Sequence, residues 1–117
     1  MPAARLPALI DELAELAKKF RTIALEASAA AALGIAAGME GDAAAAVAHF
    51  RKACRLWLEV QAPYDVASAR TGLASALGKL GDLTTARMEL DAARSSFERL
   101  GAKPDSRRAT ELLEAIA

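Results

Sequence analysis

The strongest constraint on the fold is an internal repeat with a period of 40 residues. When the chain is shifted by 40 residues, Gly41-Asp42 aligns with Gly81-Asp82 without any gap. Self-similarity at a fixed period of this length indicates a supersecondary unit that stacks on its own copy. The other aligned pairs are Gly38 with Gly78, Ala46 with Ala86, Phe50 with Leu90, Ala53 with Ala93, Trp57 with Phe97, Val60 with Leu100, Ala62 with Ala102, Asp65 with Asp105 and Ala69 with Ala109.

Each unit has the pattern of a helical hairpin. In its second half the close-packing residues recur at steps of four and three, which is one face of an α-helix. These residues are Ala46, Phe50, Ala53, Trp57 and Val60 in the first unit, and Ala86, Leu90, Ala93, Phe97 and Leu100 in the second. Small and bulky residues alternate, so two helix axes can approach closely while a ring fills the adjacent groove.

Turn residues divide the chain into helices. Glycine readily ends a helix in the left-handed conformation, and the following aspartate caps the next helix, as expected at Gly41-Asp42 and Gly81-Asp82. Between units, Pro63 and Pro104 stand where a helix begins but does not continue. We therefore expect one domain over residues 1–117 with about six helices: a half-repeat helix at 6–20, repeat one at 22–60 (helices 22–39 and 43–60), repeat two at 64–100 (helices 64–80 and 83–100) and a terminal helix at 105–116.

Composition supports an all-α fold and argues against several classes of partner. Hydrophobic residues make up 54% of the 117 residues but aromatics only 4%, and alanine dominates the rest, which favours closely packed helices over strands. Fifteen basic residues balance fifteen acidic ones, so no field of one sign attracts nucleic acid or an anionic membrane. We expect no direct nucleic-acid partner and no membrane partner.

The N-terminus and the single cysteine indicate a reducing compartment. One cysteine forms no internal disulfide, and the first residues lack the basic start and unbroken apolar run of a signal peptide. The longest charge-poor stretch, Ala27 to Met39, is too short to cross a bilayer. We expect a cytoplasmic, soluble protein.

No residue pattern supports catalysis. His49 is the only histidine and has no partner at zinc-ligand spacing, so we interpret it as a solvated helix residue. Cys54 is interpreted as an inert, buried thiol, and Trp57 as a core residue because its copy is Phe97. Nucleotide loops and serine-nucleophile motifs are absent from the sequence. We expect no enzymatic activity, no catalytic residue, no metal site and no cofactor.

The repeat resembles the tetratricopeptide (TPR) family. The small and large positions of that family fall on Leu33, Gly34, Ala37, Ala46, Phe50 and Ala53, and on Leu73, Ala74, Leu77, Ala86, Leu90 and Ala93. The resemblance implies an α-solenoid of right-handed antiparallel hairpins. Two features depart from the family: the period is 40 rather than 34, and Ala30 and Arg70 occupy the first-helix aromatic position.

A more particular resemblance covers roughly residues 27–113. This segment is similar to the C-terminal repeat segments of large bacterial regulators of the MalT-like and LuxR-type kind, and of related ATPase-linked adenylate cyclases. It implies a protein-protein interaction or signal-coupling module in a bacterial transcriptional or signalling regulator. A small-ligand sensor that uses the concave groove and a purely structural or oligomerising repeat stay open as alternatives.

In the resembled family, partners bind the concave wall formed by the first helices. The positions that this wall implies are Ser28, Ala31, Ile35, Met39, Ser68, Thr71, Ser75 and Lys79. Small residues leave room for a guest helix or an extended peptide. Separately, Leu6, Leu9, Leu13, Leu16 and Phe20 share one helical face at the N-terminus, and Leu112, Leu113 and Ile116 lie on the terminal helix. Both ends lack a neighbouring repeat that would cover these apolar residues, so we expect the chain to self-associate through residues 6–20 or 107–116.

Overall fold

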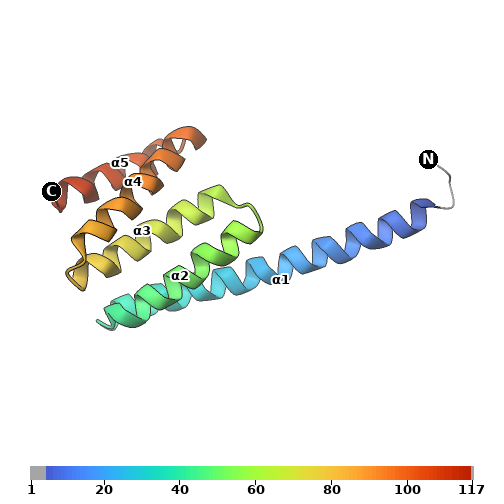
Figure 1. Ribbon diagram of the computed structural model, residues 1–117, viewed down its shortest axis with the longest axis horizontal. Helices are drawn as coiled ribbons and strands as arrows, with labels where there is room; N and C mark the ends of the chain where they lie inside the picture. The colour runs from blue at the N-terminus through green and yellow to red at the C-terminus, as the bar shows by residue number, and fades with distance from the viewer. Residues whose placement is uncertain (1–4, 117) are drawn as a thin grey trace.

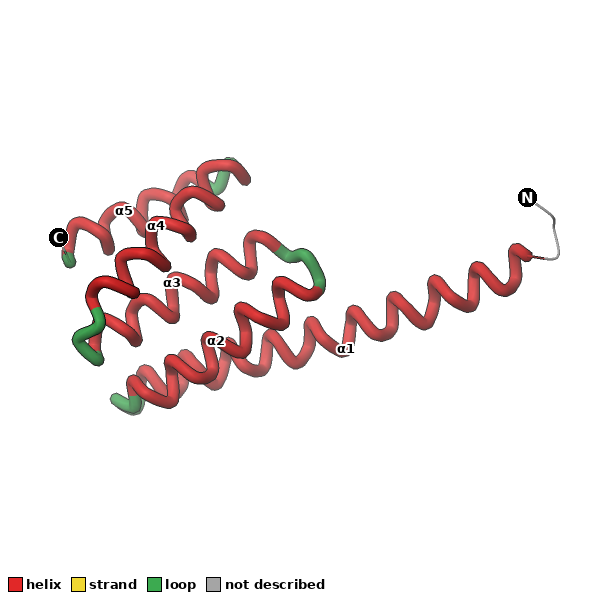
Figure 2. Tube along the Cα trace, in the orientation of Figure 1, coloured by secondary structure: helices red, strands yellow, loops and turns green. Residues whose placement is uncertain are grey.

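The protein is all-helical in a computed structural model that describes residues 5–116. Within that range there are five helices, connected by short turns, and no strand (Figures 1 and 2). The expected all-α class is thereby confirmed. The helices are α1 (Leu6–Met39), α2 (Ala43–Glu59), α3 (Pro63–Lys79), α4 (Leu83–Leu100) and α5 (Lys103–Ala115).

The Gly-Asp turns form as the sequence predicts. Gly41 and Gly81 have φ values of +82° and +86°, in the left-handed region that favours glycine. The Asp42 carboxylate accepts a hydrogen bond of 3.0 Å from the backbone N–H of Ala45, and Asp82 accepts one of 3.1 Å from Thr85. Each turn therefore ends one helix and caps the next within two residues, which brings consecutive helices back alongside each other.

The first helix differs from the expectation. Where the sequence predicts a half-repeat helix at 6–20 and another helix from 22, α1 runs without a break for 34 residues, so the prediction of six helices is wrong for the described residues. Neither glycine nor proline lies near Arg21, in contrast to the turns before Pro63 and Pro104. Thr22 instead donates its hydroxyl hydrogen to the Lys18 carbonyl oxygen, at 3.0 Å, within the helix.

Each helix packs mainly against the helices adjacent to it in the chain, with a smaller contact between α1 and α3. The N-terminal half of α1 extends away from the other four helices (Figure 1). This projection gives the molecule principal dimensions of 61 × 29 × 20 Å.

The core is formed by alanines and a few large side chains. The largest buried cluster joins all the helices through Ala37, Ala46, Val47, Phe50, Leu73, Ala74, Ala76, Leu77, Ala86 and Leu90, with Leu112, Leu113 and Ile116 of α5 packed against it. Most of the predicted helical stripes are buried, but Trp57 and Val60 are half-buried and Leu100 is exposed. The last turn of α2 and of α4 is therefore not fully covered.

Candidate functional site

Two adjoining hollows lie between α1 and α3. The first, the Trp57 hollow, has a volume of about 350 Å³ and is lined by Ser28, Ala31, Ala32, Ile35, Phe50, Trp57, Asp65, Ser68 and Ala69. The second, the Met39 hollow, has a volume of about 290 Å³ and is lined by Gly34, Ile35, Gly38, Met39, Ala43, Ala46, Phe50, Gly72, Ser75, Ala76 and Lys79. Ile35 and Phe50 belong to both, so the hollows form one surface, here named the α1–α3 groove.

The floor of the groove is the ring of Phe50, which two glycines accommodate. A Cβ atom at Gly34 of α1 would lie 2.9 Å from Phe50 Cε2, and a Cβ atom at Gly72 of α3 would lie 2.5 Å from Phe50 Cε1. Both distances are shorter than a van der Waals contact. The ring of Phe50 therefore reaches between α1 and α3 only because both helices lack a side chain there.

We expect Gly72→Ala to destabilise the protein by roughly 1 kcal/mol. Overpacking against Phe50 costs about 1–3 kcal/mol, whereas replacing a helical glycine by alanine gains about 1 kcal/mol. Gly78→Ala is the matched control in the same helix, because a Cβ atom there meets no atom within 4 Å. It should stabilise the protein. Chemical denaturation measures both changes, and an equal gain in stability for the two variants would contradict the proposed role of Gly72.

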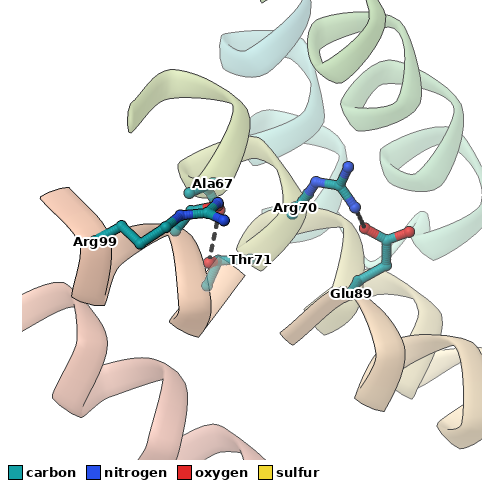
Figure 3. Close-up of polar contacts among 6 residues, drawn as sticks. Ala67, Arg70, Thr71, Glu89 and Arg99 are labelled. Carbon is teal, nitrogen blue, oxygen red and sulfur yellow. Dashed lines mark hydrogen bonds and ion pairs between the residues drawn. The ribbon is translucent and has the colours of Figure 1, made fainter. Parts of the chain in front are cut away.

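Seven of the eight residues predicted to line a binding wall do line the groove. The exception is Thr71, which is half-buried and lines neither hollow. Its hydroxyl donates a hydrogen bond of 3.0 Å to the Ala67 carbonyl oxygen of its own helix (Figure 3). Gly72, one residue further along α3, takes the expected place of Thr71 in the lining.

The groove is mostly apolar, and its two ends carry different charged side chains. Ile35 and Met39 are exposed at 58% and 85%, so a ligand that covers them would bury apolar surface. Serine hydroxyls at 28, 68 and 75 supply donors and acceptors along the walls. Asp65 lies in the Trp57 hollow and Lys79 in the Met39 hollow, so the two ends carry opposite charges.

Sequence reasoning missed two parts of this surface. Trp57 was interpreted as core, but it is half-buried and contributes to the wall of the groove as well as packing against Ala30, Ala53 and Ala69. Only the arrangement of α1 against α3 shows that its ring faces an open hollow. The second part is Gly72 beneath Phe50: Gly34 falls on a small position of the resembled family, but Gly72 has no such signal, because its counterpart 40 residues earlier is Ala32.

A larger hollow lies beside the turn that connects α2 to α3. It has a volume of about 700 Å³ and is lined by Leu58, Gln61, Ala62, Pro63, Val66, Arg70, Ala92, Ser95, Ser96 and Arg99. Arg70 of α3 points toward Glu89 of α4, with 3.1 Å between the guanidinium Nη1 and the carboxylate Oε2 (Figure 3). The Arg70 charge in this hollow, here named the Pro63 hollow, is thus already paired, whereas Arg99 donates a hydrogen bond of 3.2 Å to the uncharged Ser96 hydroxyl. No sequence pattern predicts the Pro63 hollow, because the hollow depends on how α2 and α4 lie relative to each other beside α3.

His49 and Cys54, the two other residues considered for a chemical role, line none of these three hollows. His49 is half-buried rather than fully solvated. Cys54 is also half-buried, and burial raises the pKa of its thiol from 9.0 to about 11. Among residues 5–116, His, Cys, Asp and Glu side chains form no group of three that could hold a metal ion.

One helix in the described part of the chain, α1, is long and apolar enough to cross a membrane by length and composition. The charge-poor stretch from Ala27 to Met39 is the part of α1 that supplies its buried residues, Ala27, Ala30, Gly34 and Ala37.

The fold and the groove together define an all-α protein with a shallow, mostly apolar surface between two helices. Comparison of the chain with protein-family models, curated proteins and solved structures gives no match. The likeness to the tetratricopeptide family therefore rests on the repeat and on the residues named above.

Proposed function

We propose that this chain is a non-catalytic, TPR-like repeat module that binds a protein or peptide segment in the α1–α3 groove. The observation that carries the proposal is that Ser28, Ile35, Met39, Ser75 and their neighbours line a continuous groove. These are the positions at which the resembled family binds its partners. A groove with exposed apolar residues and flanking hydroxyls suits a helix or an extended segment.

The charges at the ends of the groove favour one orientation of the bound segment. A basic group near Asp65 and an acidic group near Lys79 would each meet an opposite charge. Apolar side chains in the middle would cover Ile35 and Phe50. We therefore expect binding segments with a basic end, an apolar centre and an acidic end.

The shape of the groove favours a segment of polypeptide over an enclosed small molecule. Pockets for small ligands typically have volumes of about 300–1,000 Å³ and bury most of the ligand. The two hollows have volumes of about 350 and 290 Å³ and adjoin along the helices, so a ligand that fills both must be elongated. We further propose that the module couples partner binding to the activity of a bacterial transcriptional or signalling regulator in the cytoplasm, as the resemblance implies.

Selection of peptides from a random displayed library on the purified chain tests the proposal. Trp57 is the only tryptophan and lines the groove, so its fluorescence measures the binding of each selected peptide directly. Ser75→Glu places a charge among the apolar contacts, and an unpaired charge there costs roughly 2 kcal/mol, which weakens binding about thirtyfold. Ser75 is exposed, so the variant should fold normally.

Ser95→Glu is the matched control, because Ser95 is an exposed serine that lines the Pro63 hollow. The selected peptides should bind this variant as tightly as they bind the wild type. Loss of binding in Ser95→Glu alone would place the binding surface at the Pro63 hollow. A selection that enriches no peptide would contradict a peptide-binding function.

A further inference from the structure

One apolar seam runs along the whole of α1, and only its C-terminal part is covered. The residues of α1 that are buried are Ala27, Ala30, Gly34 and Ala37, separated by steps of three, four and three. Continuing the same steps toward the N-terminus gives Ile23, Phe20, Leu16, Leu13, Leu9 and Leu6. These are positions a and d of a heptad repeat, the pattern by which one helix packs along another.

The two parts of the seam differ in residue size and in exposure. Small residues occupy the part that packs against α2, whereas the N-terminal part has large side chains, of which Leu6, Leu13, Leu16 and Phe20 are exposed in the described part of the chain. Leu13 is 65% exposed and Leu16 is 47% exposed, although both lie on the line of the buried residues. α2 ends at Glu59, so the open part of the seam begins where α2 stops. The interface between α1 and α2 is therefore continued by an uncovered surface that fits another helix.

The charges beside the seam identify a second copy of this chain as that helix. Position g of successive heptads is occupied by Arg5, the residue just before α1, and by Glu12, Lys19 and Glu26 within it, so the sign of the charge alternates along the seam. When two copies pair antiparallel with Leu13 facing Leu16 of the second copy, Glu12 faces Lys19 and Arg5 faces Glu26 of the second copy. All four such contacts in the dimer join opposite charges, which favours this arrangement.

The same charges disfavour the other arrangements. A shift of one heptad in either direction brings Glu12 against Glu12 or Glu26 of the second copy, and Lys19 against Arg5 or Lys19. In a parallel dimer, Glu12 and Lys19 would face Ala17 and Ala24 at position e, so no ion pair would form. Only one antiparallel register satisfies both the apolar seam and the charges.

Other occupants of this surface fit less well. Four acidic and four basic side chains lie between Arg5 and Glu26, so the helix has no cationic face for an anionic bilayer surface and too many charges to cross a bilayer there. The other predicted surface for self-association, residues 107–116, is less open, because Leu112, Leu113 and Ile116 are half-buried against the core.

We propose that the N-terminal half of α1 pairs with the same segment of a second chain to form an antiparallel dimer, with Leu13 against Leu16 of the second copy. The paired segment covers residues 6–23 and ends where α2 takes over the seam. Since the rest of α1 is already folded against α2, helix nucleation does not oppose the pairing. This inference is independent of ligand binding in the α1–α3 groove.

Analytical ultracentrifugation of the full chain tests the proposal. The wild type should sediment as a dimer, and Leu13→Glu should weaken the dimer more than a hundredfold, because each subunit would bury a charge in the seam. Leu25→Glu is the matched control, since Leu25 is 72% exposed on the opposite side of α1, and it should remain dimeric. A strictly monomeric wild type, or equal dissociation by both variants, would overturn the proposal.

Charge reversal tests the register. Glu12→Lys alone and Lys19→Glu alone should each weaken the dimer about tenfold at low salt, and the double variant should regain most of the wild-type affinity. Two weakened single variants without recovery in the double variant would overturn the antiparallel register, as would single variants with unchanged affinity. Ser75→Glu, which alters only the groove, should leave the dimer intact, so failure of one proposal is distinguishable from failure of the other.

Discussion

Replacing Phe97 by alanine is expected to lower the free energy of unfolding by about 3–5 kcal/mol, a large share of the roughly 5–15 kcal/mol of a typical domain. Phe97 is 3% exposed and packs with Ala67 and Ala93 in the cluster that joins α3 to α4. The surrounding alanine side chains are too short to fill the cavity that removal of the ring would leave. The ring also contacts Tyr64 edge to face, with 5.6 Å between the ring centroids, and that contact would be lost.

Trp57→Ala provides the comparison, because Trp57 occupies the equivalent position one repeat earlier. Trp57 is half-buried, so its removal should cost clearly less stability than the removal of Phe97. Denaturant titration followed by circular dichroism measures both variants without relying on tryptophan fluorescence. A loss of stability below about 1 kcal/mol for Phe97→Ala would contradict the assignment of Phe97 to the core.

The thiol of Cys54 is expected to react with iodoacetamide about a hundredfold more slowly in the folded chain than in the unfolded chain at pH 8. The pKa of this thiol is raised from 9.0 to about 11, mainly by burial; the Arg70 guanidinium opposes the rise and the Glu89 carboxylate adds to it. Only the thiolate reacts, and each unit by which its pKa rises lowers the thiolate fraction about tenfold. The rate in the folded chain should therefore keep increasing with pH until about pH 11.

Glu89→Gln separates the change in pKa from simple protection by burial. This variant removes the carboxylate that raises the pKa of Cys54 and leaves the opposing Arg70 charge in place. The reaction should become faster, and its pH profile should move to lower pH. Equal rates in the folded and unfolded wild type, or an unchanged pH profile in Glu89→Gln, would contradict this account.

The helical class, the turns and most of the buried stripes could be predicted from the sequence because local residues determine them. Gly81 and Asp82 specify a turn through backbone conformation and one hydrogen bond, whatever the rest of the fold does. The repeat then transfers the same interpretation to Gly41 and Asp42. Most of the residues that line the groove could be predicted for the same reason, because a regular helix determines which side chains share a face.

The path of α1 could not be predicted in the same way. The repeat aligns residues 6–20 with α2, which would have placed a separate helix against α1, but no residue near Arg21 stops the helix. Leu33 shows the result. Its copy, Leu73, is 4% exposed, whereas Leu33 is 53% exposed because no preceding helix covers it. The open wall beside Trp57 likewise depends on how two helices lie together, which periodicity alone does not specify.

The length of α1 sets the spacing of the grooves in the proposed dimer. α1 has 34 residues and α3 has 17, so half of α1 serves as a rod outside the repeats. With Leu13 against Leu16 of the second copy and a rise of 1.5 Å per residue, the two copies of Ile35 lie about 60 Å apart along the rod. A spacer of fewer than about 18 residues cannot span that distance even when fully extended, and the r.m.s. length of a flexible spacer matches it only at on the order of a hundred residues. A ligand therefore gains avidity from both grooves only when its two binding segments are widely separated.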